Sequence, residues 1–368
     1  MPDHEVVIVG AGPVGLLLGC LLAERGIDVA VYEAREGADH RSRAIGIHPP
    51  GLAALQAAGV GAQVRAESLA LDRGEVICDG RVLASIAFSG EHRVLILPQH
   101  RTHALLRERL TSLRSDALRL GHTVGVVRNT QSGVSMSIGH REVSAAVVVA
   151  ADGVRSGIRR QLGIHWRRGP GRGRYAMADV PDHAADRTAR LHCERDGLVE
   201  SFPLPDGMRR WVVSDPDGVL AESEAFGRAI RDRAGLRVEL PSGTHPTPFI
   251  ARQHRAARLA AGRVVLVGDA AHETSPIGGQ GMNLGWAAAP HLAAAVARTL
   301  DGRAPDFHDY ERTALRAAAR AQRRSMFYMT MGRSVRGPAL AVRNAGIRML
   351  GSPALRRRSA AMITMQGR

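Results

Sequence analysis

The chain has 368 residues, a mass of 39.4 kDa and a hydrophobic content of 45%, enough for one large or two ordinary globular domains. Its formal net charge is +15, and all 50 cationic side chains are arginine. The absence of lysine excludes Schiff-base, pyridoxal-phosphate and P-loop kinase chemistry, because each of these needs a lysine ammonium.

The cysteines and the hydropathy pattern restrict the class of protein further. Cys20, Cys78 and Cys193 are odd in number and far apart, which favours reduced, packed thiols over a disulfide framework or a zinc site. No apolar run approaches the roughly 18 residues of a membrane span, and no basic leader precedes the first strand. We therefore expect a cytoplasmic protein without a metal site.

The first elements form the clearest motif of the chain. An apolar strand at residues 6–9 breaks at Gly10-x-Gly12-x-x-Gly15, and a helical segment and a second strand ending in Glu33 follow. This order is typical of a nucleotide-binding βαβ unit, in which the glycines allow a tight turn, close approach of a pyrophosphate and close packing of the helix. The phosphates are expected at the helix N-terminus near Pro13. Glu33 can bind a ribose diol, so a 2′-phosphate is not expected.

The pattern beyond Glu33 predicts two interleaved units. A short helix at 51–58, a helix at 99–113 and a meander of strands at 123–128, 134–138 and 143–150 continue the nucleotide fold, whereas the strand-like stretch 76–88 leaves it for another sheet. Residues 165–254 predict a separate β-sheet cap with strands at 198–204 and 210–214 and a helix at 222–234. The compact fold then ends with a core strand at 263–267 and helices at 282–300 and 306–331.

Two later motifs resemble the first, because each places a glycine and an acid at the end of a buried strand. The buried strand 147–151 ends in Asp152-Gly153, where a polar turn suits a bound diphosphate, although Asp152 would equally suit the role of cap for a helix at 156–162. The strand 263–267 delivers Gly268 and Asp269 to its carboxyl edge, and a Pro/Gly loop then exposes backbone N–H groups before a long helix. This second pattern predicts a ribityl or phosphate contact together with an anion site.

In this order the three segments resemble the class A flavoprotein monooxygenases of the 4-hydroxybenzoate hydroxylase type, over nearly the whole chain. The resemblance implies an α/β fold: a Rossmann-like, GR2-type FAD-binding domain with an inserted β-sheet substrate domain and C-terminal helices. The implied FAD domain comprises residues 1–70, 96–164 and 255–300, the substrate domain residues 71–95 and 165–254, and the helical segment residues 301–368.

The resemblance also assigns residues to a non-covalently bound FAD. Gly10, Gly12 and Gly15 would bind its pyrophosphate, Glu33 its adenosine ribose and Asp269 its ribityl chain. Further assignments are Arg41 and Arg43 of an R-x-R-A loop beside the flavin, Gln99 at a strand-to-helix step, and Asp152 with Gly153 between FAD and its nicotinamide donor, NADPH or NADH. The remaining residues expected at the cofactor are Ala11, Pro13, Val14, Val124, Gly268, Pro276, Gly279, Gln280, Gly281, Met282 and Asn283.

The implied chemistry is reduction of FAD by the nicotinamide, formation of a hydroperoxyflavin with O2, and oxygen transfer to an aromatic, quinonoid or polyketide-like molecule by hydroxylation or epoxidation. Pro276, Gly279 and Arg43 are the expected catalytic residues, since bare backbone donors at a helix start stabilise the negative charge of reduced flavin and Pro276 leaves room for oxygen. Phe202, Pro203 and Trp211 are candidate walls of the substrate pocket, and each also suits the cap's core.

Some features stay open at this stage. Pro290 is expected to kink the long helix, and His272 to pack near the sheet. The basic tail 333–368 predicts two helices that form a lid or contact a membrane surface, with packing on the FAD domain as the alternative. A flavin-dependent reductase or dehydrogenase and a non-enzymatic FAD-binding protein are the alternative functions, while nucleic-acid binding is not expected.

Overall fold

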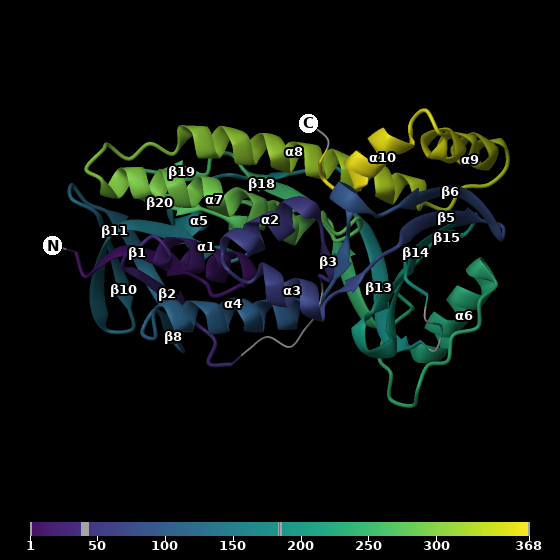
Figure 1. Ribbon diagram of the computed structural model, residues 1–368, viewed down its shortest axis with the longest axis horizontal. Coiled ribbons are helices and arrows are strands. Elements are labelled where there is room, and N and C mark those ends of the chain that lie inside the picture. The colour runs from purple at the N-terminus through teal and green to yellow at the C-terminus, as the bar shows by residue number, and fades with distance from the viewer. Residues whose placement is uncertain (1, 38–43, 183, 185, 367–368) are drawn as a thin grey trace.

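The computed structural model describes residues 2–37, 44–182, 184 and 186–366. Two large sheets dominate it (Figure 1). One belongs to the part of the molecule that contains the N-terminus, and the other faces it from the opposite end. The long helices α7 (Gln280–Leu300) and α8 (His308–Met331) lie side by side; α7 lies over the part with the N-terminus, and α8 extends toward the other end. The fold is the α/β class that the sequence predicts.

The nucleotide-type sheet has eight strands in the order β19-β20-β11-β1-β2-β8, and β10 and β9 extend it from β11. Strands β20, β11, β1, β2 and β8 pair in parallel. Val6, Ile8, Val148 and Val265 have no exposed surface, as expected for a parallel sheet covered on both faces. The strand bounds are His4–Val9 (β1), Val29–Glu33 (β2), Leu118–Leu120 (β8), Val124–Asn129 (β9), Val134–Ile138 (β10), Arg141–Ala150 (β11), Ala260–Ala261 (β19) and Val264–Leu266 (β20).

Helices cover this sheet and fix the edge at which its strands end. Helix α1 (Pro13–Ala23) packs against α4 (Gln99–Leu113) and α7, while α2 (Pro49–Ala57) packs against α7 and α3 (Gly61–Glu67). Helix α7 is continuous through Pro290, so this proline does not end it. Proline removes only one backbone donor from a helix, and the flanking Ala289 and Leu292 are fully buried.

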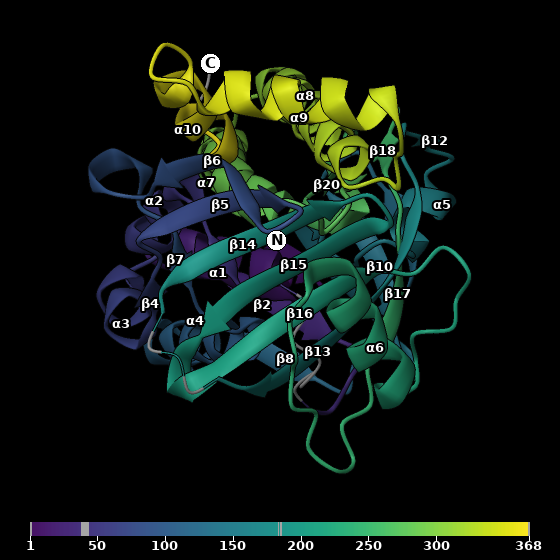
Figure 2. The same cartoon turned by 90° about the vertical axis from the view of Figure 1, so that its right-hand side faces the viewer.

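The second sheet has seven strands in the order β17-β13-β16-β15-β14-β5-β6. The stretch expected to leave the nucleotide fold forms the hairpin β5–β6, and β5 pairs in parallel with β14 from the central part of the chain. Helix α6 (Ser223–Ala234) lies on the outer face of this sheet (Figure 2). The strand bounds are Arg73–Cys78 (β5), Arg81–Ala87 (β6), Gly173–Pro181 (β13), Thr188–Glu194 (β14), Gly197–Leu204 (β15), Met208–Ser214 (β16) and Thr247–Ala251 (β17).

Smaller elements join the two halves. Two three-stranded sheets have the orders β3-β7-β4 and β12-β18-β21, and helix α5 (Gly157–Gln161) follows β11. The strands of these sheets are Gly46–Ile47 (β3), Leu69–Ala70 (β4), Leu95–Ile96 (β7), Trp166–Arg168 (β12), His254–Ala256 (β18) and His272–Glu273 (β21).

The tail forms the two helices that the sequence predicts, α9 (Pro338–Gly351) and α10 (Arg356–Ile363). Helix α9 contacts β6, and α10 contacts both α9 and β6, so the tail packs on the seven-stranded sheet (Figure 1). The alternative of packing on the nucleotide-type sheet is therefore not what the structure shows. Within the described residues, every helix is too short or too polar to cross a membrane.

Candidate active site

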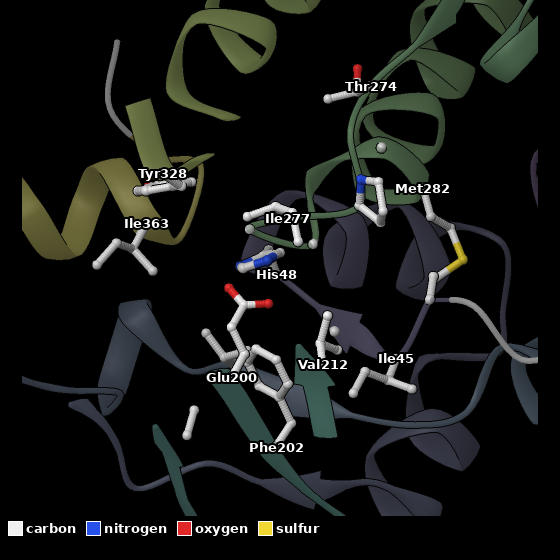
Figure 3. Close-up of a pocket in the computed structure, with 18 of the residues that line it drawn as sticks. Ile45, His48, Glu200, Phe202, Val212, Thr274, Ile277, Met282, Tyr328 and Ile363 are labelled. Atoms are coloured by element: carbon white, nitrogen blue, oxygen red, sulfur yellow. The ribbon is translucent and has the colours of Figure 1, made fainter. Parts of the chain in front are cut away.

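A cavity of about 620 Å³ lies between the two sheets, and residues from most of the chain line it (Figure 3). One end is formed by the β1–α1 turn, by the residues after β11 and β20, and by the loop before α7. The other end is formed by the inner face of the seven-stranded sheet and by α8, α9 and α10. The same space therefore joins the predicted phosphate-binding turn to the predicted substrate sheet.

The three motif glycines differ in what constrains them. Gly10 has a φ of +106°, and a Cβ there would lie 2.5 Å from the carbonyl oxygen of Ala151. A Cβ at Gly15 would overlap the carbonyl oxygen of Gly10, so packing requires both of these glycines. A Cβ at Gly12 would meet no atom within 4 Å, and this residue borders the cavity. Gly12 thus leaves room for an occupant of the cavity beside the start of α1.

Glu33 lies at the end of β2, next to this turn. Its Oε2 accepts a hydrogen bond from the Ala11 N–H at 3.0 Å, and its Oε1 pairs with the Arg35 guanidinium at 2.9 Å. Burial acts to raise the pKa of Glu33, but the hydrogen bonds from Arg35 and Ala11 outweigh it and hold the pKa below its usual value. The group is therefore an ionised acceptor, beside a small recess that His103 also lines.

The Asp-Gly motif after β11 lies at a helix start, and its contact with a diphosphate stays a prediction. Ser156 is the N-cap residue of α5, and its Oγ accepts from the Arg159 N–H at 3.0 Å. Asp152 supports the same helix start by accepting from the Ile158 N–H at 3.3 Å through Oδ2, whereas its buried Oδ1 has no partner among the described residues. Gly153 lines the cavity.

The loop before α7 presents backbone rather than charged groups. Gly278 and Gly279 have φ values of +88° and +65°, in the left-handed region that favours glycine, and Gly279 is the N-cap of α7 without a side-chain capping bond. Asn283 fixes this helix start: it accepts from the His48 N–H at 2.8 Å and donates to the Gly46 and Gly279 carbonyls. Donors at the start of a long helix thus face the cavity, as expected for an anion-stabilising site.

Many of the residues expected at the cofactor line the cavity. These are Gly12, Pro13, Val14, Gly15, Gln99, Gly153, Gly268, Asp269, Pro276, Gly279, Gly281 and Met282. Gly10, Ala11, Glu33, Asp152, Gln280 and Asn283 stand directly behind this lining, in contact or in sequence with it. Arg41 and Arg43 lie outside the described residues.

Val124 is placed away from the cavity. It begins β9 and pairs with Ile138 of β10. Its side chain packs against the core of the nucleotide-type sheet. The cofactor contact expected at Val124 stays a prediction that the cavity lining does not support.

The three candidate substrate walls divide between the two faces of their sheet. Phe202 lines the cavity, whereas Pro203 and Trp211 do not. Trp211 packs instead with Phe226 and Ile230 of α6 on the outer face. Side chains alternate along a strand, so Phe202 and its immediate neighbour Pro203 must face opposite ways.

The structure also adds lining residues that the sequence motifs do not indicate. His48, at the start of α2, is fully buried, and burial lowers its pKa to about 4. Glu200, on β15, is buried, and burial raises its pKa to about 8. The period-two rule applied to Phe202 would have found Glu200, but nothing in the sequence links His48 to this loop. The helices after α7 also contribute: Phe327, Tyr328, Ile347, Leu350, Met362 and Ile363 line the cavity.

His272 is fully buried near the sheet, as expected, with neither ring nitrogen hydrogen-bonded among the described residues. Burial lowers its pKa to about 4.

Cys78, Asp79 and Glu194 form a group with ligand atoms within 4.8 Å of one another among the described residues. Arginines already neutralise it: Arg195 pairs with Asp79 at 3.0 Å, and Arg343 of α9 contacts the Cys78 sulfur at 3.5 Å. Arg343 also donates to the Cys193 carbonyl. This cluster anchors α9 to the sheet.

The residues present fit FAD by the observations above. Gly12 leaves a cradle that a side chain would fill, the N-termini of α1 and α7 lack side-chain caps, and the buried amide of Gln280 has no partner among the described residues. A Rossmann-like sheet whose cavity continues to a second, mostly antiparallel sheet is the architecture expected of a flavin-dependent monooxygenase.

Comparison with known proteins gives the family. Residues 3–325 match the family described as FAD binding domain, and the chain belongs to it. The chain is 32% identical over 343 residues to 12-dehydrotetracycline 5-monooxygenase/anhydrotetracycline 6-monooxygenase of Streptomyces rimosus, covering 85% of this chain and 67% of that protein. It is 31% identical over 323 residues to rifampicin monooxygenase of Streptomyces venezuelae, covering 82% and 66%. The chain thus spans about two thirds of these curated relatives.

Solved structures of similar proteins superpose on this chain. Anhydrotetracycline hydroxylase from Streptomyces rimosus superposes with a TM-score of 0.80 at 29% identity, over 98% of this chain and 76% of that one. The p-nitrophenol 4-monooxygenase of Pseudomonas putida superposes with a TM-score of 0.83 over 99% and 98%, and at 23% identity this likeness concerns the fold alone. The protein is therefore an FAD-dependent monooxygenase, as the sequence resemblance implies.

Proposed function

We propose that the protein hydroxylates a lipophilic, polycyclic aromatic molecule of the polyketide type with NADPH or NADH and O2. The observation that carries this proposal is the single cavity that continues from the β1–α1 turn to Phe202, with a largely apolar lining at the sheet end. Relatives named for tetracycline and rifampicin oxygenation support a substrate of that size and polarity.

In this proposal residues of the cavity lining and directly behind it would hold FAD. The N–H groups at the start of α1 bind the pyrophosphate beside Gly12, and Glu33 accepts from the adenosine ribose. Asp269 and Gln99, both in the cavity lining, bind the ribityl side. FAD, when bound, takes electrons from the nicotinamide and activates dioxygen for transfer to the substrate.

The chain's own contribution to the chemistry is electrostatic and steric. The uncapped N-terminus of α7 behind Gly279 stabilises negative charge on a reduced ring, and Pro276 forms the wall beside it without a competing donor. The apolar residues of the seven-stranded sheet and of α8 to α10 exclude water from the reacting atoms. Arg43 is a further proposed contributor, on the grounds of its sequence motif alone.

Helices α9 and α10 act as a lid in this proposal, since Ile347 and Ile363 line the cavity from the tail. The outer side of α9 exposes 73% of Val342 and 59% of Met349 next to arginines, which suits weak contact with an anionic membrane surface. Co-sedimentation with phosphatidylserine vesicles tests that contact: the protein should pellet at low salt, and no pelleting would contradict it.

The activity is tested with purified, FAD-loaded protein. We expect anhydrotetracycline or another fused-ring phenol to accelerate oxidation of NADPH or NADH and to gain one labelled oxygen from dioxygen. If nicotinamide oxidation with substrate gives a reduced organic product under anaerobic conditions, the protein is a flavin-dependent reductase instead.

A further inference from the structure

Glu200 is the one acidic side chain of β15, and it is inserted into an apolar part of the cavity wall. Its cross-strand neighbours are Leu191 of β14 and Val212 of β16. On its own strand Leu198 and Phe202 share its face, and all of these residues line the cavity. Figure 3 shows the Glu200 carboxylate pointing from the sheet toward His48 and the Ile277 loop.

This carboxyl has no hydrogen bond or ion pair within the part of the chain that the structure describes, although only 3% of the residue is exposed. Burial is the sole cause that raises its pKa to about 8. Other buried acids of the same sheet are engaged; Glu194, for example, accepts from the Asp79 N–H at 2.9 Å. An unpaired buried polar group costs free energy of folding, so an apolar residue would stabilise this position.

The position of Glu200 in the cavity also suits a role in the proposed reaction. Glu200 projects from the sheet at one side of the cavity, and the Pro276–Gly279 loop and His48 stand opposite (Figure 3). A flat ring bound between them would present its edge to the carboxyl. Because His48 is buried with its pKa lowered to about 4, it is neutral near pH 7 and does not compete as a cation.

We propose that Glu200 accepts a hydrogen bond from a phenolic or enolic hydroxyl of the substrate and takes its proton during turnover. This assignment rests on the proposed function and names the group that selects and activates the substrate. The substrate O–H bond breaks, its electron pair stays on the substrate oxygen, and a new O–H bond forms on the carboxylate. Nothing is oxidised or reduced in this step, and the proton returns to the product oxygen before release.

The consequence is a ring whose carbons next to and opposite the oxygen carry more electron density, which favours attack on an electrophilic oxygen. A base whose pKa lies near the working pH is suited to such a transfer, because it is partly ionised and still basic. The titratable or charged groups that face Glu200 or share its cavity wall come from every surrounding element: His48, Glu75, Tyr175, Cys193, Arg210 and Tyr328. Arg210 is engaged in a bidentate ion pair with Asp179 at 2.7 Å.

The test compares two probes with the FAD-loaded protein, 4-nitrophenol and its methyl ether 4-nitroanisole, which lacks the hydroxyl. Binding is followed by the change in flavin absorbance, and ionisation of bound 4-nitrophenol by its own phenolate band. The wild-type protein should prefer 4-nitrophenol by about tenfold or more. The bound phenolate fraction should rise with pH through the titration of Glu200, near pH 8.

Glu200→Gln should shift the pH midpoint at which bound 4-nitrophenol ionises, while its amide oxygen can still accept from the hydroxyl; Glu200→Leu should shift the midpoint and also remove the hydroxyl preference. Glu200→Leu gives a second variant that should fold at least as well as the wild type, since its neighbours are apolar. Glu75→Gln is the control, because Glu75 is another acid of the cavity lining and its Oε2 lies 3.8 Å from the Arg190 Nε. This variant should retain the preference for 4-nitrophenol over 4-nitroanisole. An unchanged preference and pH profile in both Glu200 variants overturns this assignment alone. If neither probe binds and anhydrotetracycline or another fused-ring phenol also leaves the wild type inactive, the proposed function is overturned and this assignment with it.

Discussion

Gly10 and Gly12 are two residues apart in sequence, but they have different structural roles. A Cβ at Gly10 would collide with the Ala151 carbonyl in a backbone conformation that disfavours side chains, whereas a Cβ at Gly12 would enter open space. Gly10→Ala should therefore lower the free energy of unfolding of the FAD-free protein by about 2 kcal/mol or more.

Gly12→Ala should leave that stability within about 0.5 kcal/mol of the wild type and weaken FAD binding at least about tenfold. Urea unfolding of the FAD-free proteins and fluorescence titration with FAD measure the two effects. Equal stability losses in the two variants would show that Gly12 is also a packing residue.

The faces of the seven-stranded sheet predict a similar contrast between two aromatic residues. Trp211 packs against α6, so Trp211→Ala should cost about 3–5 kcal/mol of stability and leave ligand binding in the cavity intact. Phe202→Ala removes cavity wall and should change the affinity for an aromatic ligand more than it changes stability. Thermal unfolding and flavin-absorbance titrations compare them, and a loss of ligand affinity in Trp211→Ala would contradict the placement.

At the scale of elements, the docking of α9 depends on one close approach. A Cβ at Gly351 would lie 2.6 Å from the Ala84 Cβ of β6, whereas Gly346, in the same helix, has open space around it. Gly351→Val should loosen α9 from the sheet, accelerate trypsin cleavage in the arginine-rich tail and weaken binding of a lipophilic ligand, with FAD still bound.

Gly346→Val is the matched control and should behave like the wild type in all three measurements. Were the two variants equally resistant to trypsin, α9 would not depend on this contact. The result would then argue against a lid built from the tail.

Elements with strong local signals could be predicted from the sequence. The helix predicted at 99–113 is Gln99–Leu113, and the strand predicted at 134–138 is Val134–Ile138, because each has a clear apolar period and a proline or glycine boundary. The sequence pattern predicts the hairpin β5–β6 only as one strand-like stretch, although Asp79-Gly80 marks its turn with two positive φ values.

The candidate site was predictable where a glycine motif or an acid ends a strand, because such motifs are local in sequence and can be recognised without knowing the tertiary structure. It was not predictable where the lining comes from partner strands. Which of Glu200 and Ser201 faces the cavity depends on the register of β15 with β14 and β16. His48 meets the loop before α7 only because Asn283 binds its backbone across 235 residues of sequence.

The whole molecule should respond to pH through three buried groups. The pKa values of His48 and His272 fall from 6.5 to about 4 in the folded state, so the unfolded chain binds more protons in that range and stability falls as the pH drops through it. The pKa of Glu200 rises from 4.5 to about 8, so the folded state retains a proton that the unfolded chain loses, and stability falls as the pH rises through this range.

Stability should therefore rise with pH up to about pH 6.5, where the histidine effect ends, and fall above it, where only the Glu200 effect remains. Each tenfold difference in proton affinity between the folded and unfolded states corresponds to about 1.4 kcal/mol. Glu200→Gln should flatten the alkaline side of the profile, and His272→Gln should flatten the acidic side. Urea unfolding of the FAD-free proteins between about pH 5 and about pH 8 measures both slopes. A wild-type alkaline slope that persists in Glu200→Gln would exclude this role for the carboxyl.

The parallel pairing of β1 with β11 and of β11 with β20 carries a consequence for how the chain is made. Val6 of β1 pairs with Val147 of β11, and Val148 pairs with Val264 of β20. The edges of β1 and β11 therefore stay unpaired at these positions until most of the chain has been synthesised. Exposed strand edges invite pairing between nascent copies. Recovery of soluble protein should therefore depend on slow synthesis and chaperone supply more steeply than its final stability would suggest.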